Sequence, residues 1–403
     1  MLVNRCLVTI WRNLAEGVGQ VDAEVAVVGA GVVGSAVALA LATRGVSVAL
    51  VEAESEPGLA ASGTNSGILH TGFDSKPGEL ETALILRAGA IRDPVLDALG
   101  VPVKRCGGLL RPLDGAGGDA VRAIAANAAR NGVAVAPRDD GALEVPGEAV
   151  TDPVAFTLAI AGAAQAHGAK LQTGVRVEEI RRDGEVLALA GSGSGAVRAG
   201  FVVNCAGLGA GEVASLIGDE SFEVYPRKGE FLVFDPPDGK KLDRILLPVP
   251  ERGTKGVLVF PTIDDKIVAG PTAHDQEDPS DWSVRGEARE LIMPRAVAMF
   301  PPLEGAEPIA AYAGLRPAGR GVNYLIEVSA ACGRFVNVAA IRSTGLTASL
   351  AIAERVCELL AGAGLELGAE EPLRRGNTAP DRGAWWSRTA LYREARAQAA
   401  PAR

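Results

Sequence analysis

The sequence lacks the features that define several classes of protein. It has no run of about 18 apolar residues, so it predicts no helix that crosses a membrane. Its formal net charge is −9, which argues against nucleic acid as a partner. Its five cysteines lie far apart without a CxxC pair, so they predict neither a metal site nor a disulfide framework. Reduced thiols are typical of a cytoplasmic protein. Whether the protein also binds peripherally to the inner face of the membrane stays open.

The sequence is instead long and rich in glycine. Its 403 residues, 48% of them hydrophobic, are enough to bury the cores of more than one domain. Its 50 glycines predict many tight turns and places where the backbone approaches a ligand closely. Only three histidines are present, which narrows the search for a catalytic base.

After an N-terminal extension, the chain begins with a strand, a glycine-rich turn, a helix and a second strand. Residues 24–28 (EVAVV) predict a buried strand, and residues 29–34 (GAGVVG) follow at once. Residues 35–44 predict a helix, and residues 46–51 predict a second strand that ends at Glu52. This order is the context that a dinucleotide-binding GxGxxG motif requires.

Each residue of this motif has a physical role. Gly29 permits the turn, Gly31 lets a pyrophosphate approach the backbone, and Gly34 lets the helix pack close to the strand. The free amides and the dipole at the helix N-terminus attract phosphates. Glu52 follows Gly34 by 18 residues, where its carboxylate can accept hydrogen bonds from the adenosine ribose. A carboxylate there repels a 2′-phosphate, so NADP is disfavoured.

The segments that follow favour FAD over NAD. Residues 54–72 form a glycine- and serine-rich stretch where an NAD enzyme usually continues with its second helix. Residues 150–168 predict a helix that opens with capping residues and a proline, and residues 170–177 predict a strand. Residues 183–184 (DG) are typical of a hairpin turn. Residues 202–207 (VVNCAG) predict another buried strand that ends in glycine.

Three stretches resemble the D-amino-acid oxidase superfamily of flavoproteins. Residues 202–210 (VVNCAGLGA) resemble its strand and turn beside the cofactor, and residues 313–317 (AGLRP) resemble its substrate-binding arginine motif. Residues 338–353 (VAAIRSTGLTASLAIA) resemble its last strand and glycine turn, which lead into a helix directed at the flavin. The resemblance covers about residues 22–363.

Within that superfamily, the chain resembles the branch of FAD-dependent glycerol-3-phosphate dehydrogenases and L-2-hydroxyglutarate oxidases. This similarity rests on residues 62–78, 226–231 (PRKGEF) and 256–274. One departure weakens an assignment to glycerol 3-phosphate, because Asp74 replaces the arginine that some of these dehydrogenases carry.

The pattern predicts an α/β fold with two domains and a C-terminal extension. A Rossmann-like FAD-binding domain is expected to be discontinuous, over residues 22–90, 146–222 and 330–363. The segments 91–145 and 223–329 interrupt it with strand-like runs between proline and glycine turns. They predict a second, mostly antiparallel β (α+β) substrate domain. Residues 364–403 are expected to form a peripheral extension, whose Trp385 and Trp386 pack on the body or on a partner subunit.

The resemblance also implies which residues hold the cofactor. Beyond the glycine motif and Glu52, they are Ser62, Asn65, Ser66, Val177, Ala206, Gly207, Gly314, Ser343, Thr344, Gly345, Leu346 and Thr347. For Asn65 and Ser66, a role in a turn is an equal alternative. The Ser343–Thr344–Gly345 turn opens a helix predicted over residues 348–360, whose positive end can stabilise negative charge on the flavin.

Four residues are candidates for the chemistry. Arg316 is expected to bind a substrate carboxylate or phosphate, with a structural ion pair as the alternative. His70 is the first candidate for the base that takes a hydroxyl proton, and His274 is the reserve. Lys228 is expected beside the flavin, where it stabilises the reduced anion or meets oxygen; a solvated lysine is its alternative. The third histidine, His167, is predicted to lie on the surface.

Together these residues predict an FAD-dependent oxidoreductase. It oxidises a secondary alcohol in a small anionic molecule, such as glycerol 3-phosphate or 2-hydroxyglutarate, by hydride transfer to the flavin. Oxidation of an amine or amino acid is one alternative, and a flavin-binding subunit without its own turnover is another. The sequence leaves open whether oxygen, a quinone or a partner redox protein reoxidises the flavin, and whether the chain forms a homo-oligomer.

Overall fold

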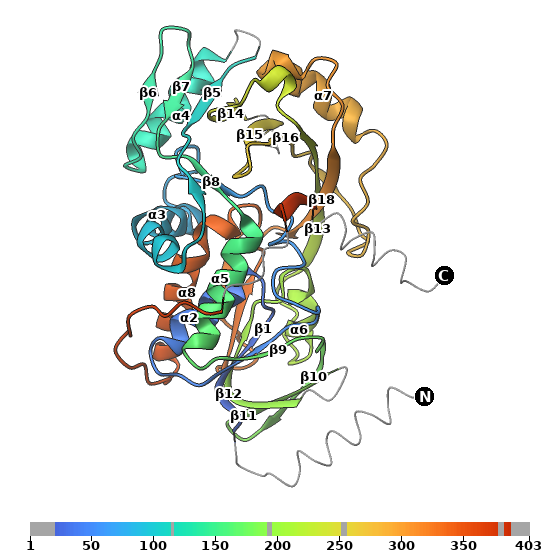
Figure 1. The fold of residues 1–403 in the computed structure, drawn as a ribbon. Helices are drawn as coiled ribbons and strands as arrows, with labels where there is room; N and C mark the ends of the chain where they lie inside the picture. The colour runs from blue at the N-terminus through green and yellow to red at the C-terminus, as the bar shows by residue number, and fades with distance from the viewer. Residues whose placement is uncertain (1–20, 114–116, 192–195, 251–255, 378–382, 388–403) are drawn as a thin grey trace.

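A computed structural model describes residues 21–113, 117–191, 196–250, 256–377 and 383–387. Two large sheets lie toward opposite ends of the molecule (Figure 1). Two long strands, β13 and β18, belong to the second sheet, and both contact the short helix η1 (Gly207–Gly209) of the first unit. The predicted mixed α/β fold with two sheets of different character is confirmed.

The first sheet is built on parallel strands and has the order β10-β11-β12-β1-β2-β9, with β20 beside β12 and β19 beside β20. Its strands are β1 (Ala23–Val28), β2 (Val48–Val51), β9 (Lys170–Gln172), β10 (Val177–Asp183), β11 (Val186–Gly191), β12 (Ala196–Asn204), β19 (Leu325–Val328) and β20 (Phe335–Ala339). The pairs β9–β2, β2–β1, β1–β12 and β12–β20 are parallel. The central strands β1, β2 and β20 are apolar almost throughout because both faces of the sheet are covered there.

Helices pack against this sheet and against one another. They are α2 (Val32–Ala42), α3 (Leu80–Leu99), α5 (Pro153–Ala166), α6 (Ala210–Ser215) and α8 (Gly345–Gly362). Helix α2 contacts both α5 and α8, which its small buried residues allow. At the start of α5, the Asp152 carboxylate accepts hydrogen bonds from the amides of Val154 and Ala155, and Pro153 occupies the first turn.

The second sheet is mostly antiparallel and has the order β17-β13-β16-β15-β14-β5-β7-β6, with β18 beside β13. Its strands are β5 (Gly108–Arg111), β6 (Ala136–Pro137), β7 (Leu143–Val145), β13 (Val224–Phe234), β14 (Ile245–Pro248), β15 (Leu258–Pro261), β16 (Ile267–Gly270), β17 (His274–Asp275) and β18 (Ala310–Gly319). Helices α4 (Gly118–Arg130) and α7 (Ala288–Met299) pack on opposite faces of it. The short helices η2 (Pro237–Gly239) and η3 (Pro301–Leu303) lie in its connections.

A small third sheet joins the two units. It consists of β3 (Ile68–Leu69), β8 (Ala149–Thr151) and β4 (Val103–Lys104), in the order β3-β8-β4. Strand β8 therefore brings residues near 149 beside residues near 69, although they are far apart in the sequence.

The structure corrects three details of the sequence reading. The strand predicted over residues 170–177 ends at Gln172, because Gly174 adopts a left-handed conformation (φ +72°), and Val177 begins β10. Helix α3 packs against α8, and β19 pairs with β20, so both lie with the first sheet rather than with the substrate domain. The domain boundaries otherwise stay a prediction.

The described part of the C-terminal extension packs on the body. Leu365 joins the core around the first sheet, and the Trp385 ring packs edge-on against Tyr312 of β18, with 5.3 Å between ring centroids. Within the described ranges, no helix is both long and apolar enough to span a bilayer.

Candidate active site

A cavity of about 560 Å³ lies at the turn between β1 and α2. Gly29 has φ +99°, and a Cβ there would lie 2.5 Å from the carbonyl oxygen of Cys205 in the strand alongside. A Cβ at Gly34 would lie 1.9 Å from the carbonyl oxygen of Gly29. Both positions therefore require glycine, one for the conformation of the turn and the other for the close packing of α2.

The N-terminus of α2 opens into this cavity. Gly31 is its N-cap and has no side-chain cap of its own. The Ser62 hydroxyl accepts a hydrogen bond from the amide of Val32, at 2.9 Å. The positive end of the helix and its backbone amides form a site suited to phosphate.

Glu52 lies at the other side of the same turn. One of its carboxylate oxygens accepts a hydrogen bond from the amide of Ala30 (2.7 Å), and the other accepts one from Glu54 (2.8 Å). Burial raises the pKa of Glu52, and these hydrogen bonds oppose that rise. Each carboxylate oxygen keeps acceptor capacity for a ribose hydroxyl.

The lining of this cavity fits an extended dinucleotide. Glu52 and Val177 line it together with Gly345 and Leu346 at the start of α8, which places two helix N-termini around one cavity. The predicted cofactor residues that line it are Gly29, Gly31, Glu52, Ser62, Asn65, Val177, Ala206, Gly207, Gly345 and Leu346. A phosphate-binding turn, an acid for the ribose and a second helix end are what FAD needs.

A second cavity, of about 360 Å³, adjoins the first and shares four of its lining residues. These are Ala61, Asn65, Pro317 and Arg342. The predicted residues Ser66, His70, Gly314, Arg316 and Ser343 line this second cavity. A group bound along the first cavity can therefore reach a small molecule in the second.

His70 is paired with a carboxylate that the sequence reading missed. Its Nδ1 lies 3.1 Å from Oε2 of Glu148, which is fully buried. The other oxygen of Glu148 accepts hydrogen bonds from the amide (2.7 Å) and the hydroxyl (2.9 Å) of Thr71. Glu148 directly precedes β8, and the pairing of β8 with β3 brings it to His70. This arrangement favours the His70 tautomer with the proton on Nδ1.

Arg316 reaches the cavity from β18. A Cβ at Gly229, which is opposite Gly314 on β13, would lie 2.2 Å from the Arg316 guanidinium, so this glycine makes room for the side chain. Its guanidinium donates a hydrogen bond to the carbonyl oxygen of Thr272, at 3.4 Å. Among the described residues, no carboxylate forms an ion pair with it, which disfavours the structural ion pair given above as its alternative.

Two more arginines line the cavity beside Arg316. Arg227 forms an ion pair with Asp275 (2.6 Å), and Arg342 donates a hydrogen bond to the side chain of Asn323 (2.9 Å). Burial, with repulsion from Arg227 and Arg342, lowers the pKa of Arg316 to about 10. It is therefore cationic at neutral pH. Arg342 lies 3.9 Å from Glu81, so both neighbouring arginines have a carboxylate partner, whereas Arg316 has none among the described residues.

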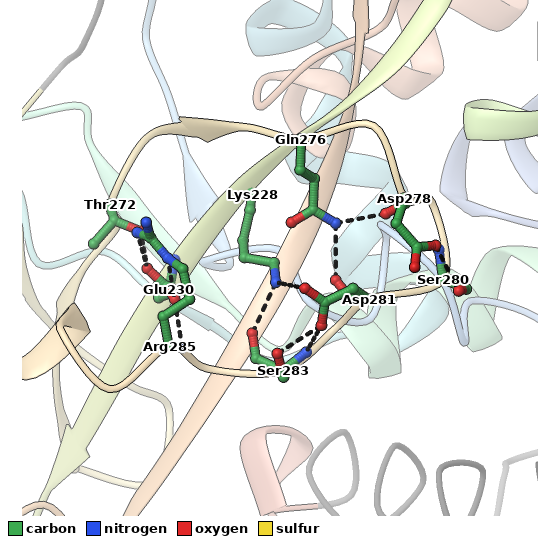
Figure 2. Close-up of polar contacts among 9 residues, drawn as sticks. All are labelled: Lys228, Glu230, Thr272, Gln276, Asp278, Ser280, Asp281, Ser283 and Arg285. Atoms are coloured by element: carbon green, nitrogen blue, oxygen red, sulfur yellow. Dashed lines mark hydrogen bonds and ion pairs between the residues drawn. The ribbon is translucent and has the colours of Figure 1, made fainter. Parts of the chain in front are cut away.

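Two of the predicted catalytic residues lie elsewhere. The Lys228 side chain is fully buried, but its ammonium donates to Asp281 (2.7 Å) and to the carbonyl oxygen of Ser283 (3.0 Å), and it lines neither cavity (Figure 2). Alternation along β13 explains this, because its neighbour Arg227 takes the face that the cavity occupies. His274, the reserve base, is exposed in β17 and also lines neither cavity.

Several residues assigned to the cofactor instead hold the loops around it. The Thr344 hydroxyl is hydrogen-bonded to Tyr324 (2.7 Å) and Glu81 (2.6 Å). The Thr347 hydroxyl accepts from the amide of His70 (3.1 Å). Both are buried and line neither cavity. The side chain of Asn65 accepts a hydrogen bond from the amide of Gly67, as the turn role requires, and it also lines both cavities; its contact with the flavin stays a prediction.

The surface position predicted for His167 is wrong. Its side chain is 1% exposed, because residues 371–374 of the C-terminal extension cover it. Its Nε2 accepts a hydrogen bond from the amide of Arg374, at 3.0 Å. The extension was expected to be peripheral, so no sequence pattern indicated that it covers His167.

Among the polar residues that the sequence analysis missed, Arg227 and Arg342 line the substrate cavity, and Glu148 lies behind His70. Arg227 and Arg342 were within quoted motifs, one residue from Lys228 and Ser343. Because both arginines are adjacent to residues already assigned to the site, the sequence could have indicated that they lie near it. Glu148 had no such signal, because only the pairing of β3 with β8 brings it to His70.

Comparisons with known proteins agree with this geometry. A model of the family described as "FAD dependent oxidoreductase" matches residues 24–359. The glycerol 3-phosphate dehydrogenase of Caloramator mitchellensis is 28% identical, over 84% of this chain and 73% of that one. The glycerol 3-phosphate oxidase of Mycoplasma pneumoniae is 26% identical, over 84% and 94%.

Solved structures of other proteins have a similar fold. The dithionite-reduced L-alpha-glycerophosphate oxidase of Mycoplasma pneumoniae, with FAD bound, superposes with a TM-score of 0.79 at 24% identity, over 87% of this chain and 96% of that one. Glycine oxidase of Bacillus cereus gives 0.75 at 21% identity, over 88% and 100%. The predicted superfamily, cofactor and enzyme class are confirmed by the family match, and the chain belongs to the family of FAD dependent oxidoreductases.

Proposed function

We propose that this oxidoreductase oxidises the CH–OH group of a small anionic hydroxy compound. Glycerol 3-phosphate is the first candidate and 2-hydroxyglutarate is the second. The observation that carries the proposal is Arg316, a guanidinium without an ion-pair partner among the described residues, in one cavity with His70. The cavity volume, about 360 Å³, lies within the range of roughly 300–1,000 Å³ usual for small-molecule sites.

Arg316 holds the anionic group of the substrate. Its guanidinium offers parallel N–H donors that match a phosphate or a carboxylate. Arg227 and Arg342 add positive charge at the same end of the cavity. An anion therefore compensates the charge of Arg316, which no carboxylate among the described residues pairs with, whereas a neutral alcohol does not.

His70 takes the hydroxyl proton. With its Nδ1–H donated to Glu148, the Nε2 lone pair is left to accept that proton. The negative charge of Glu148 then stabilises the imidazolium that forms. FAD, when bound, supplies the acceptor for the hydride that leaves the carbon bearing this hydroxyl group.

The relatives support the choice of candidates. Two of the relatives reported above are named for glycerol 3-phosphate. Others, such as that of Escherichia coli (strain K12), are named L-2-hydroxyglutarate dehydrogenase. Asp74 lines the substrate cavity, where some glycerol-3-phosphate dehydrogenases are expected to carry arginine, so the phosphate contact rests on the three arginines above.

Oxidation of an amine is the second candidate. Asp74 and Glu81 line the same cavity as Arg316, and carboxylates of this kind pair with an ammonium group. A neutral amine needs no strong base, so this reaction would depend little on His70.

Anaerobic reduction of the flavin tests the proposal. The holoprotein is mixed with glycerol 3-phosphate, L- and D-2-hydroxyglutarate, lactate and a set of amino acids, while flavin absorbance is followed. We expect bleaching by one anionic hydroxy compound, and a loss of about 10²- to 10³-fold in kcat/KM for Arg316→Ala. Arg320→Ala is the matched control, because Arg320 follows the same strand but pairs with Glu223 at the surface.

The outcomes separate the candidates. Bleaching by amino acids alone would favour amine oxidation. A flavin that dithionite reduces but no compound on the panel bleaches would contradict the proposal and favour a subunit without its own turnover. The electron acceptor, a cytoplasmic location and assembly into a homo-oligomer are parts of the proposal that need separate measurement.

A further inference from the structure

One segment of the second unit reaches both cavities. Residues 272–285, here called the covering segment, connect β16 to α7. At its beginning, Thr272 and Ala273 line the substrate cavity. Further along, Pro279, Ser280 and Trp282 line the cofactor cavity. The segment therefore forms part of the wall of the cofactor cavity, although it belongs to the other sheet.

Few apolar contacts hold this segment in place. Only Thr272 is buried among its residues, all of which the structure describes, and its regular structure is limited to the two residues of β17. A segment of this kind opens at low cost unless polar contacts fasten it.

At the surface, β17 pairs with β13, and ion pairs join Asp275 to Arg227 (2.6 Å) and Glu277 to Arg320 (3.1 Å). Two buried charged residues of β13 supply the other contacts (Figure 2). Glu230 binds both ends of the segment: its carboxylate accepts from the Thr272 hydroxyl (2.7 Å) and from the backbone and guanidinium of Arg285 (2.7–3.0 Å). Lys228 binds the middle, where its ammonium donates to Asp281 and to the carbonyl oxygen of Ser283.

The contacts within the segment make it stiff between these points. The Gln276 amide donates to the carbonyl oxygens of Asp278 (2.6 Å) and Asp281 (3.0 Å). The Asp281 carboxylate also accepts from the amide (3.0 Å) and the hydroxyl (2.6 Å) of Ser283. A change at Asp281 is therefore transmitted to Ser280 and Trp282, which are its neighbours in the cavity wall.

The Lys228 contact has a strong energetic reason to persist. A fully buried ammonium is strongly unfavourable unless it is paired and hydrogen-bonded, so the loss of one partner is costly. Partial burial would raise the pKa of Asp281, but hydrogen bonds from Lys228 and Ser283 hold it at about 2. Asp281 is therefore ionised throughout the neutral range.

We propose that Lys228 and Glu230 are positioning residues for the cofactor: they fasten the covering segment so that residues 279–282 close the wall of the FAD cavity and slow the release of FAD. This role rests on the family of the chain and not on the identity of its substrate. It assigns a function to the buried side of the PRKGEF stretch, whose Arg227 and Phe231 line the substrate cavity on the opposite face.

The release of FAD tests this proposal directly. Holoprotein is diluted, and the rise in flavin fluorescence gives the rate at which FAD leaves. We expect Asp281→Asn to release FAD about tenfold faster than the wild type, because it leaves Lys228 without its charged partner. Trp282→Ala, which removes the wall and leaves the Lys228 pair intact, should accelerate release to a similar degree.

A matched control separates positioning from general stability. Arg289 and Glu307 form an ion pair of similar length (2.6 Å) at the surface beside α7, and Glu307→Gln should leave the release rate unchanged. The melting temperature of the apoprotein is measured for every variant, since a purely structural pair would lower it without changing the release rate. Release rates within twofold of the wild type for both Asp281→Asn and Trp282→Ala would overturn the proposal.

Lys228→Met gives a second variant of the pair. Combined with Asp281→Asn, it should add little further acceleration, because either change alone already breaks the contact. Fully additive effects of the two substitutions would contradict a shared role. The failures of the two proposals are distinguishable, because the release of FAD is measured without substrate: unchanged release rates contradict this proposal, whereas wild-type holoprotein that no compound on the panel bleaches contradicts the proposed function.

Discussion

The cofactor cavity and the substrate cavity are built in different ways. The phosphate-binding part of the first comes from the short stretch between β1 and Glu52, and its shape depends on backbone atoms: the turn at Gly29, the close contact at Gly34 and the amides of α2. The second is assembled from side chains of distant segments, with His70 and Glu148 from one side and Arg316 from the other. A site made of contiguous backbone tolerates no added atom, whereas a site made of side chains depends on which way each of them points.

The largest effect on FAD content is expected at the backbone-defined site. Gly34→Ala adds a Cβ that would overlap the carbonyl oxygen of Gly29. Because the overlap is with backbone and not with a flexible side chain, it is relieved only if α2 or the turn at Gly29 moves. We expect the FAD content of the purified protein to fall at least about tenfold. Gly89→Ala in α3 is the matched control, because a Cβ there meets nothing within 4 Å. Full FAD content in Gly34→Ala would show that the turn is less constrained than its geometry indicates.

The next effect concerns the base in the substrate cavity. His70→Gln should lower kcat by about 10²- to 10⁴-fold, the usual range for a general base, with FAD content unchanged. Stopped-flow reduction under anaerobic conditions measures the step. A decrease of less than tenfold would indicate that the hydroxyl proton leaves by another route. It would then favour amine oxidation as the function.

A smaller effect is expected from the carboxylate behind that base. Glu148→Gln keeps the shape of the side chain but removes the charge that stabilises the imidazolium. We expect kcat/KM to fall about tenfold, as steady-state kinetics would measure. Glu144→Gln is the control, because Glu144 lies nearby in β7 but pairs with Arg138 outside the cavity. An unchanged kcat/KM would leave Glu148 with a packing role only.

The smallest effect follows from the charge of Arg316. Its pKa is lowered to about 10, so the cationic form predominates up to about pH 9 and is lost as the pH rises through 10. The KM for an anionic substrate should therefore be flat from pH 7 to 9 and rise about fourfold by pH 10.5. Steady-state kinetics across this range check it. A flat KM up to pH 10.5 would indicate that the bound anion or solvent keeps the guanidinium charged.

The PRKGEF stretch explains why part of the site could not be predicted from the sequence. Arg227 and Lys228 are both cationic and adjacent, and either could line a cavity beside the flavin. Successive side chains of a strand point to opposite faces, so only one of them can do so, and the register of β13 against β18 selects Arg227. The prediction chose Lys228, whose ammonium lies on the hidden face with Asp281.

The sequence by itself determined the cofactor class, the turn at Gly29 and the acid at Glu52, because these features depend on neighbours along the chain. It also located Arg316 and His70 through motifs whose residues do reach the substrate cavity. Only the tertiary structure decided that Glu148 lies behind His70, that Lys228 faces the covering segment, and that His167 is covered by the C-terminal extension. The reason is physical: strand pairing and the choice of face are set by contacts between residues far apart in the chain, and these contacts exist only once the chain has folded.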